Sequence, residues 1–380
     1  MQAQLNTFQD AVRHAAAERK VLRLRGGGTK DFLGQNLQGE VLDTRSYAGI
    51  ISHEPSELVI TVRAGTPLAE VEAALASKGQ SLAFEPPHFG PGATVGGMVA
   101  AGLSGPARAS VGAVRDFILG ARFINGKGED LTFGGQVMKN VAGYDVSRLL
   151  AGSWGTLGII TEVSLKVLPV APAEATLMCA GLAQAPALDL LHRWGGQPLP
   201  LNASAWVHDT TAQPAQDMLF VRLRGAVAAV ESAVTRMSAD AQSMGAQVTR
   251  MDNQQVAADW VASREQTLPF FTAPSEDACL WRLSVPQTAP VLDVPYAQYI
   301  EWQGAQRWLW APASAAGVLR QAAQKVGGHA TLMRPSRSGG DADRSAGVFT
   351  PMPEALQRIQ RNLQQQFDPQ GVFATGRMGA

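Results

Sequence analysis

The sequence is poor in cysteine and has no excess of charge of either sign. Its 380 residues contain two cysteines, Cys179 and Cys279, and 32 basic residues balance 32 acidic ones. Two distant cysteines argue against a disulfide scaffold and for a reducing compartment, and they are too few to hold an iron–sulfur cluster. The balanced charge gives no electrostatic reason to expect nucleic acid or an acidic membrane surface as a partner, and it leaves a partner protein open.

Local metal motifs and long apolar runs are also missing. The six histidines are scattered, and no HExxH or CxxC pattern occurs, so we expect no metal site. No run of about 18 apolar residues is present, which predicts no membrane span. The first 20 residues lack the apolar core of a signal peptide, whereas Leu5, Phe8 and Val12 at helical spacing predict a docked amphipathic helix.

Glycine, by contrast, is abundant, and three glycines follow one another in VLRLRGGGTK, directly after a strand-like run. Consecutive glycines lose backbone entropy on folding, so a function or a tight turn must compensate. Neither a P-loop nor a GxGxxG fingerprint fits, because Thr29 precedes Lys30 without the required upstream glycine and Asp31 stands where the last glycine belongs. Two interpretations stay open for this segment alone: a simple turn, or a cradle of backbone N–H groups for an anion.

The pattern recurs at 89–106 and 151–163, which are also rich in small residues beside apolar segments. A single turn rarely needs small residues at Ala93, Thr94, Gly96 and Gly97 together, whereas the close approach of a flat ligand does. Three such loops within one region predict one large, polar or phosphorylated ligand.

The first half of the chain predicts short strands and helices. The β-branched run 57–62 is typical of a buried strand, and the next segment predicts a helix with Thr66 as N-cap, Pro67 in its first turn and Gly79 as its stop. The alternation around Asn125-Gly126 predicts a hairpin.

In 159–169, Val163, Leu165 and Val167 share one face and polar residues alternate with them, which predicts a half-buried strand that Pro169 closes. After a linker at 169–175, strands alternate with helices and an aromatic hairpin, which indicates α+β layers on an antiparallel sheet. The polar stretch 334–347 predicts an irregular mobile loop, and a final helix is expected at 353–366.

A set of motifs resembles the FAD-binding family of vanillyl-alcohol oxidase type. The motifs read RLRGGGTK, PGATVGGMVAAGLSGP, GAVRDFILGARFINGKGE, KNVAGYDVSRLLAGSWGTLGIITEVSLKVLP and, near the C-terminus, FDPQGVFATGRM. Each is weak alone, but the set is specific and covers the chain to about residue 170 and its last stretch. Within the family, EPPHFGPGATVGG, VRDF and KNVAGYDVSRL are most similar to the FAD-binding subunits of bacterial glycolate oxidase.

The resemblance implies an α+β fold with a two-subdomain FAD-binding domain at 1–170, a cap domain on an antiparallel sheet at 171–345, and a segment at 346–380 that returns to the FAD domain. It also assigns FAD contacts by position in the motifs. These are Gly26, Gly27, Gly28 and Thr29 at the diphosphate, with Arg25 adding charge; Pro86, Ala93, Thr94, Gly96 and Gly97 along the ADP–ribityl path; Gly112 and Asp116 beside them; and the backbone of Ile160 at the flavin or adenine end.

The chain departs from family patterns at several positions. Relatives with covalently attached flavin carry a histidine in the first glycine loop, where this chain has Thr29, so we expect non-covalent FAD. Trp154 stands where catalytic relatives commonly have glutamate, and no motif resembling HGDGNxH is present. No catalytic residue is therefore assigned.

Other residues keep two interpretations. His329 is a base near the flavin or a structural histidine, and Arg334 with Arg337 binds a small carboxylate or forms a solvated loop face. Lys139 neutralises a phosphate or lies at the surface, while Tyr144 and Asp145 belong to a family motif in which Asp145 caps the next helix. Trp302, Trp308 and Trp310 form a partner patch or a packed hairpin.

The function implied by the resemblance is that of an FAD-binding subunit that supports oxidation of glycolate, a small 2-hydroxy acid, to glyoxylate. Its partners are then a second flavin subunit and an iron–sulfur subunit that receives the electrons. We expect a cytoplasmic protein, with any association with the inner membrane made through these partners. Two alternatives are a self-sufficient flavin dehydrogenase or oxidase of another 2-hydroxy acid or alcohol, and a non-catalytic assembly subunit with a vestigial flavin fold.

Overall fold

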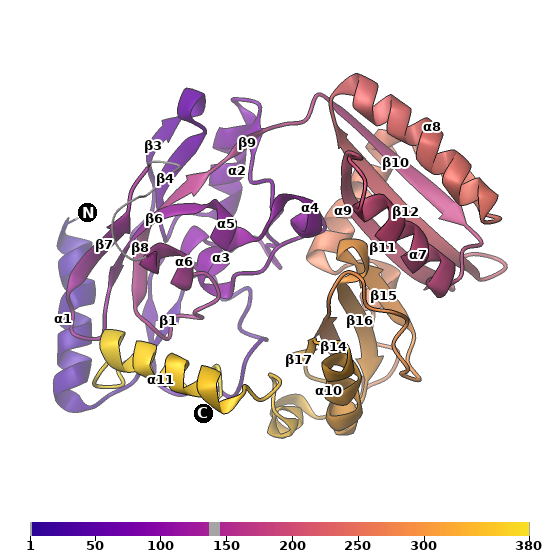
Figure 1. Ribbon diagram of the computed structural model, residues 1–380. Helices are drawn as coiled ribbons and strands as arrows, with labels where there is room; N and C mark the ends of the chain where they lie inside the picture. The colour runs from indigo at the N-terminus through magenta and orange to yellow at the C-terminus, as the bar shows by residue number, and fades with distance from the viewer. Residues whose placement is uncertain (1, 137–144, 380) are drawn as a thin grey trace. The chain divides into compact units, whose positions relative to one another are not determined.

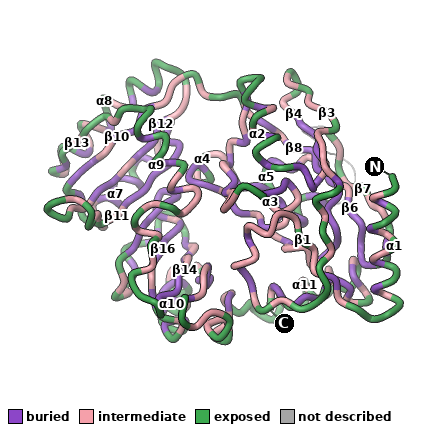
Figure 2. The backbone as a smooth tube through the Cα atoms, turned by 180° about the vertical axis from the view of Figure 1, so that it is seen from behind, coloured by how far each residue is buried: buried purple, intermediate pink, exposed green. Residues whose placement is uncertain are grey.

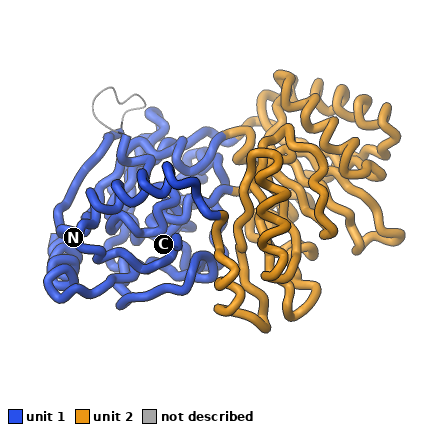
Figure 3. Tube along the Cα trace, turned by 60° about the horizontal axis from the view of Figure 1, so that its bottom comes forward, with its two compact units in different colours: residues 1–104, 112–170, 351–380 blue, residues 105–111, 171–350 orange. Residues whose placement is uncertain are grey.

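A computed structural model describes residues 2–136 and 145–379, which form two compact units (Figure 1, Figure 3). Unit 1 comprises 1–104, 112–170 and 351–380, and unit 2 comprises 105–111 and 171–350. No helix in the described part of the chain is both long and apolar enough to cross a membrane.

Two short segments belong to unit 2 although the sequence placed them elsewhere. Residues 105–111 do so because Trp302 Nε1 donates to the Gly105 carbonyl over 2.9 Å and Ser110 Oγ donates to the Leu201 carbonyl over 2.7 Å. Residues 346–350 do so because the Leu332 amide donates to the Val348 carbonyl over 2.8 Å. The predicted boundaries at 170 and 345 take no account of either contact, since both depend on residues distant in sequence.

Unit 1 is built on a five-stranded antiparallel sheet in the order β3-β4-β8-β6-β7. Its strands are β3 (Ile50–Glu54), β4 (Val59–Arg63), β8 (Ile159–Lys166), β6 (Ile118–Ile124) and β7 (Asp130–Gly134). Two small sheets accompany it, the parallel pair β1 (Leu22–Arg25) and β2 (Glu40–Asp43) and the antiparallel pair β5 (Gln80–Ser81) and β9 (Leu168–Pro169). The helices are α1 (Gln2–Glu18), α2 (Leu68–Ala76), α3 (Val95–Ala101), α5 (Val114–Phe117), α6 (Val146–Leu149) and α11 (Glu354–Phe367), with a 3₁₀ turn η1 (Pro55–Glu57).

The N-terminal helix is docked, as its apolar spacing predicted. Leu5, Phe8 and Val12 of α1 are buried in one apolar cluster with Val372 and Phe373. Figure 2 shows both buried and exposed stretches along α1. The C-terminal stretch thus packs against the first helix of the chain, because both supply apolar side chains to the same cluster.

Three local expectations for unit 1 need correction. Thr66 is not the N-cap of α2, because its hydroxyl accepts from the Gly49 amide and donates to the Arg63 carbonyl, and Pro67 occupies that position. The hairpin at Asn125 is confirmed, but its loop spans 125–129 and is closed by the Asn125 side chain rather than by a two-residue turn. Strand β8 is not half-buried, since Ser164 is itself buried and bonds to Thr61.

Unit 2 is built on an eight-stranded antiparallel sheet in the order β13-β10-β12-β11-β15-β16-β14-β17, as the sequence predicted. Its strands are β10 (Ala173–Ala180), β11 (Leu201–Asp209), β12 (Gln216–Gly225), β13 (Gln247–Arg250), β14 (Cys279–Ser284), β15 (Gln298–Glu301), β16 (Gln306–Ala311) and β17 (His329–Arg334). The helices are α4 (Arg108–Val111), α7 (Gln184–Gly195), α8 (Val227–Ser243), α9 (Asn253–Glu265) and α10 (Ala316–Lys325). Short 3₁₀ segments are η2 (Pro269–Phe271), η3 (Trp302–Gly304), η4 (Ala313–Ala315) and η5 (Gly340–Ala346).

One face of this sheet carries the apolar core of unit 2. Helices α7 and α8 pack on its β10–β12 half and α10 packs on its β14–β17 half, each through a cluster of buried side chains (Figure 1). Helix α9 lies on the opposite face, where Trp260 Nε1 donates to Thr176 Oγ1. Side chains alternate between faces along each strand, so the second face carries the more polar residues.

In unit 2 one of two open alternatives is excluded, and one expectation needs correction. Trp302, Trp308 and Trp310 do not form an exposed partner patch, because each indole nitrogen donates to an acceptor inside the unit and the first two rings are buried. The stretch 334–347 is not irregular throughout, since η5 forms there and Asp343 accepts from the Ser336 amide and hydroxyl.

Candidate functional site

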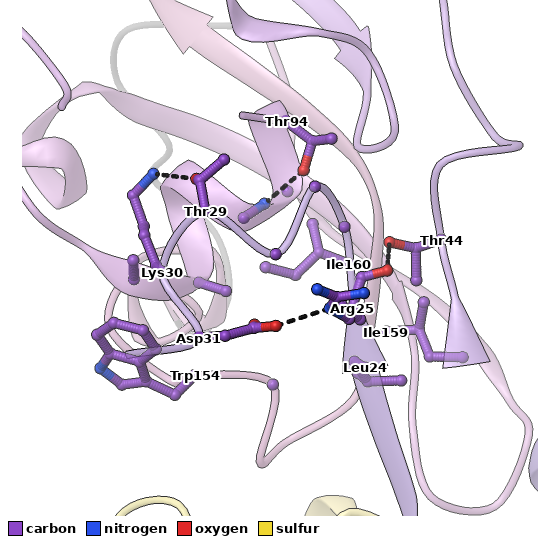
Figure 4. A pocket seen from close by; sticks show the side chains of 18 of the residues that line it. Leu24, Arg25, Thr29, Lys30, Asp31, Thr44, Thr94, Trp154, Ile159 and Ile160 are labelled. Carbon is purple, nitrogen blue, oxygen red and sulfur yellow. Dashed lines mark hydrogen bonds and ion pairs between the residues drawn. The ribbon is translucent and has the colours of Figure 1, made fainter. Parts of the chain in front are cut away.

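Three segments that lie far apart in the sequence line one cavity inside unit 1 (Figure 4). They are the glycine turn after β1, the start of α3 and the segment from Trp154 into β8. The cavity has a volume of about 90 Å³. Its lining residues are Leu24, Arg25, Gly26, Gly27, Gly28, Thr29, Lys30, Asp31, Thr44, Thr94, Gly96, Gly97, Ala100, Ala101, Trp154, Gly155, Gly158, Ile159, Ile160 and Arg377. The three glycine-rich loops therefore meet at one place, as the sequence predicted.

The glycine turn needs its glycines because two loops touch through their backbones. A Cβ on Gly27 would lie 1.5 Å from the carbonyl oxygen of Gly92, and one on Gly26 would lie 2.4 Å from Thr94 Oγ1. Gly28 has φ +71°, a conformation that a residue with a side chain adopts only at a cost. The bare backbone at these positions lets the first loop approach the second and turn back toward β1.

The same turn offers unpaired backbone donors. The N–H groups of Gly26, Gly27, Gly28 and Thr29 find no hydrogen-bond acceptor among residues 2–136 and 145–379. Successive free N–H groups in a tight turn form a concave anion-binding site. The turn is therefore suited to hold a phosphate or diphosphate group.

Of the charged side chains that line the cavity, three are basic and one is acidic. Arg25 and Asp31 form an ion pair of 2.7 Å, so these two charges offset each other. The buried Lys30 donates from Nζ to the His88 carbonyl over 3.1 Å, and Arg377 Nη2 donates to the Lys30 carbonyl over 2.7 Å. The guanidinium of Arg377 also stacks on the Trp154 ring, with its Cζ 4.6 Å from the ring centroid. The two charges of Lys30 and Arg377 favour an anionic ligand.

The cavity is large enough for one group of a ligand rather than for a whole dinucleotide. Pockets that enclose whole small ligands have volumes of about 300–1,000 Å³. The volume, the free N–H groups and the positive charge together fit a diphosphate.

Most of the residues assigned to FAD from the sequence lie in this cavity, and some do not. The lining includes Arg25, Gly26, Gly27, Gly28, Thr29, Thr94, Gly96, Gly97 and Ile160, and it excludes Pro86, Ala93, Gly112 and Asp116. Asp116 accepts from the Ala113 amide over 2.8 Å, and Gly112 beside it has φ +102°, so both shape the turn before α5. FAD contact by any of these residues stays a prediction.

Sequence reasoning missed the contributions of Lys30, Trp154 and Arg377 to this cavity. Lys30 directly follows the glycine turn, which was the available signal. Arg377 lies almost 350 positions further along the chain, as its bonds to Lys30 and Leu33 show (separations of 347 and 344 residues), and no local pattern links it to the turn. Lys139 and Tyr144 lie outside the described residues, and Asp145 sits at the N-cap position of α6 without a capping hydrogen bond.

The thiols and metal-binding side chains do not gather into a redox site in the described residues. No cluster of His, Cys, Asp or Glu there could hold a metal ion. Both cysteines are free and buried in unit 2, and burial raises the pKa of Cys179 to about 12 and that of Cys279 to about 11. Such thiols are inert structural groups.

Comparison with known proteins defines the class of protein to which this chain belongs. Residues 3–144 match the model of the family "FAD binding domain". The fold is similar to alkyldihydroxyacetonephosphate synthase, with a TM-score of 0.68 at 16% identity over 96% of this chain and 73% of that one. The predicted α+β fold of vanillyl-alcohol oxidase type is confirmed, and the chain is a flavoprotein whose cofactor is FAD.

A relative that aligns along nearly the whole of both chains identifies the family more closely. The chain is 43% identical to glycolate oxidase subunit GlcE of Escherichia coli over 98% of its own length and 96% of the relative. It is also 33% identical to glycolate oxidase subunit GlcD of Bacillus subtilis and 28% identical to a mitochondrial D-lactate dehydrogenase of Arabidopsis thaliana, over 37% and 43% of this chain and 30% and 29% of theirs. The chain belongs to the family of glycolate oxidase subunit GlcE.

Proposed function

We propose that this chain is the FAD-binding subunit of a glycolate oxidase complex, which oxidises glycolate to glyoxylate and passes the electrons to an iron–sulfur partner. The observation that carries the proposal is the 43% identity to a glycolate oxidase subunit along nearly the whole of both chains. The cytoplasm is the proposed location, with any contact with the inner membrane made through partners.

The residues of unit 1 bind and orient the cofactor in this proposal. The free N–H groups from Gly26 to Thr29 hold the diphosphate, while Lys30 and Arg377 neutralise its charge. FAD supplies the hydride-acceptor chemistry when it is bound. The chain's part is to fix the phosphate end, so that the rest of the cofactor is presented in one orientation.

The proposed electron path leaves through a partner subunit. The thiols of Cys179 and Cys279 are buried in unit 2 and are held protonated by burial, so they are poorly suited to ligate a cluster. We therefore assign the iron–sulfur centre to a partner, beside a second flavin subunit.

Co-expression tests the proposal directly. The chain is produced with the flavin and iron–sulfur subunits proposed as its partners, purified through a tag on this chain, and assayed with glycolate and an artificial electron acceptor. We expect co-purification of both partners, a flavin absorbance spectrum and glyoxylate formation. A complex that retains flavin but leaves glycolate unchanged contradicts the proposed substrate, and full turnover by the isolated chain favours a self-sufficient enzyme instead.

Non-covalent attachment of FAD is a separate prediction, made because Thr29 replaces the histidine that tethers flavin in covalent relatives. Acid or heat denaturation is expected to release all the yellow colour into the supernatant, and the denatured chain should have its unmodified mass in mass spectrometry. Flavin mass retained on the chain would refute this prediction.

A further inference from the structure

The polar face of the unit 2 sheet holds an arginine in an unusual position. Arg282 lies on β14, between Trp281 and Leu283, which point into the buried core. Side chains alternate along a strand, so Arg282 faces away from that core. Directly opposite it lie Thr331 on β17 and Trp308 on β16.

The guanidinium of Arg282 finds no hydrogen-bond acceptor in the described part of the chain. Its Nε is shielded from solvent without a hydrogen-bond partner, and no hydrogen bond or ion pair links the side chain to any other described residue. The residue as a whole is only partly exposed. Arginine carries five N–H donors and stays charged, so a shielded Nε without an acceptor is costly.

The neighbours of Arg282 add positive charge rather than compensate it. Burial, and then the charge of Arg108, lower the pKa of Arg282 to about 10. Arg108 is held in place by stacking on Trp302, with its Cζ 4.5 Å from the ring centroid. His329 is an exposed residue at the start of β17, and desolvation, followed by the charge of Arg282, lowers its pKa, so its imidazole is neutral near pH 7 and can donate or accept a hydrogen bond.

A hydroxyl group and an imidazole complete the surroundings of Arg282. Ser284 pairs with His329 across β14 and β17, and residues directly opposite each other in antiparallel strands share a face. Arg282, Ser284 and His329 thus lie on one face, with the ring of Trp308 beside Arg282 as an apolar wall. This combination offers a charged fork, a hydroxyl and a neutral imidazole to a small anion.

We propose that Arg282, with Ser284 and His329, binds the carboxylate of a small hydroxy or keto acid on unit 2 of this chain. A guanidinium matches the two oxygens of a carboxylate, and the neutral hydroxyl and imidazole suit the second polar group of a 2-hydroxy acid. The identity of the acid rests on the proposed function. The anion site itself follows from the unpaired arginine alone.

Isothermal titration of the purified, FAD-loaded full chain tests the site. Oxalate and glycolate are the carboxylate probes, and inorganic phosphate at the same ionic strength is the anion control. We expect both carboxylates to bind and Arg282→Gln to weaken binding about tenfold or more, since hydrogen bonds to charged groups are the strong ones. Arg282→Lys should retain part of the affinity, because the charge is kept but the fork is lost.

A matched control is Arg250→Gln, because Arg250 is an exposed arginine of the same unit that pairs with Glu231 over 2.8 Å. It should leave carboxylate binding unchanged. Circular dichroism and flavin content check that each variant is folded. Absence of carboxylate binding to the folded wild-type chain, unchanged binding in Arg282→Gln, or phosphate binding as tight as oxalate binding would each overturn the proposal.

Kinetics of the assembled complex separate this inference from the proposed function. Arg282→Gln is expected to raise KM for glycolate about tenfold or more while flavin content stays constant. If the complex oxidises glycolate with an unchanged KM in the variant, the carboxylate site is wrong and the proposed function stands. If oxalate binds through Arg282 but no complex oxidises glycolate, the proposed function fails and the anion site stands.

Discussion

Replacing Gly27 with alanine is expected to abolish FAD retention. The new Cβ would lie 1.5 Å from the carbonyl oxygen and 2.3 Å from the carbonyl carbon of Gly92, and neither backbone atom can turn aside as a side chain would. The two loops must separate, at an overpacking cost of about 3 kcal/mol. Because the free N–H groups of the turn depend on this approach, we expect FAD affinity to fall about 100-fold.

The measurement is the flavin-to-protein absorbance ratio after gel filtration, followed by titration of the apoprotein with FAD. Gly317→Ala is the matched control, because Gly317 lies in α10 and an added Cβ there meets nothing within 4 Å. It should keep full flavin content, and stability should rise by about 0.5–1 kcal/mol through a lower unfolded-state entropy. A Gly27→Ala protein with wild-type flavin content would show that the turn does not hold the diphosphate.

Replacing Arg377 with methionine is expected to loosen the glycine turn after β1. Arg377 donates to the Lys30 carbonyl over 2.7 Å and to the Leu33 carbonyl over 3.1 Å, and it stacks on Trp154. Methionine keeps the apolar stem but leaves the Leu33 carbonyl without a donor and the Lys30 carbonyl with the Leu33 amide alone, at a cost of about 3 kcal/mol. We expect the melting temperature of the FAD-bound chain to fall by roughly 10 °C and FAD affinity to fall at least tenfold.

Thermal unfolding followed by flavin fluorescence measures both effects together. Arg358→Gln is the control, since Arg358 lies on the exposed surface of α11 and should change neither quantity. If Arg377→Met lowers stability but leaves FAD affinity intact, Arg377 has only a structural role. If it changes neither, the C-terminal segment does not support the turn.

Local patterns identified the strands, most helices and the glycine turn because these depend on neighbours in the chain. The hairpin at Asn125 and the docked helix with Leu5 and Phe8 follow from short-range spacing. Thr66 was misassigned because its hydroxyl finds Gly49 and Arg63, partners that only the folded chain brings near it. The aromatic residues of β16 show the same limit, since whether an indole is exposed depends on what packs over it.

The sequence by itself determined that three loops in the first half of the chain are rich in glycine and other small residues. The set of motifs there already indicated FAD. Only the tertiary structure decided that Gly27 touches Gly92, that Arg377 from the far end of the chain lines the same cavity, and that Arg282 has no counterion among residues 2–136 and 145–379. The physical reason is that glycine acts through its own dihedral freedom, which is local, whereas a charge is paired or unpaired according to which distant residues folding places beside it.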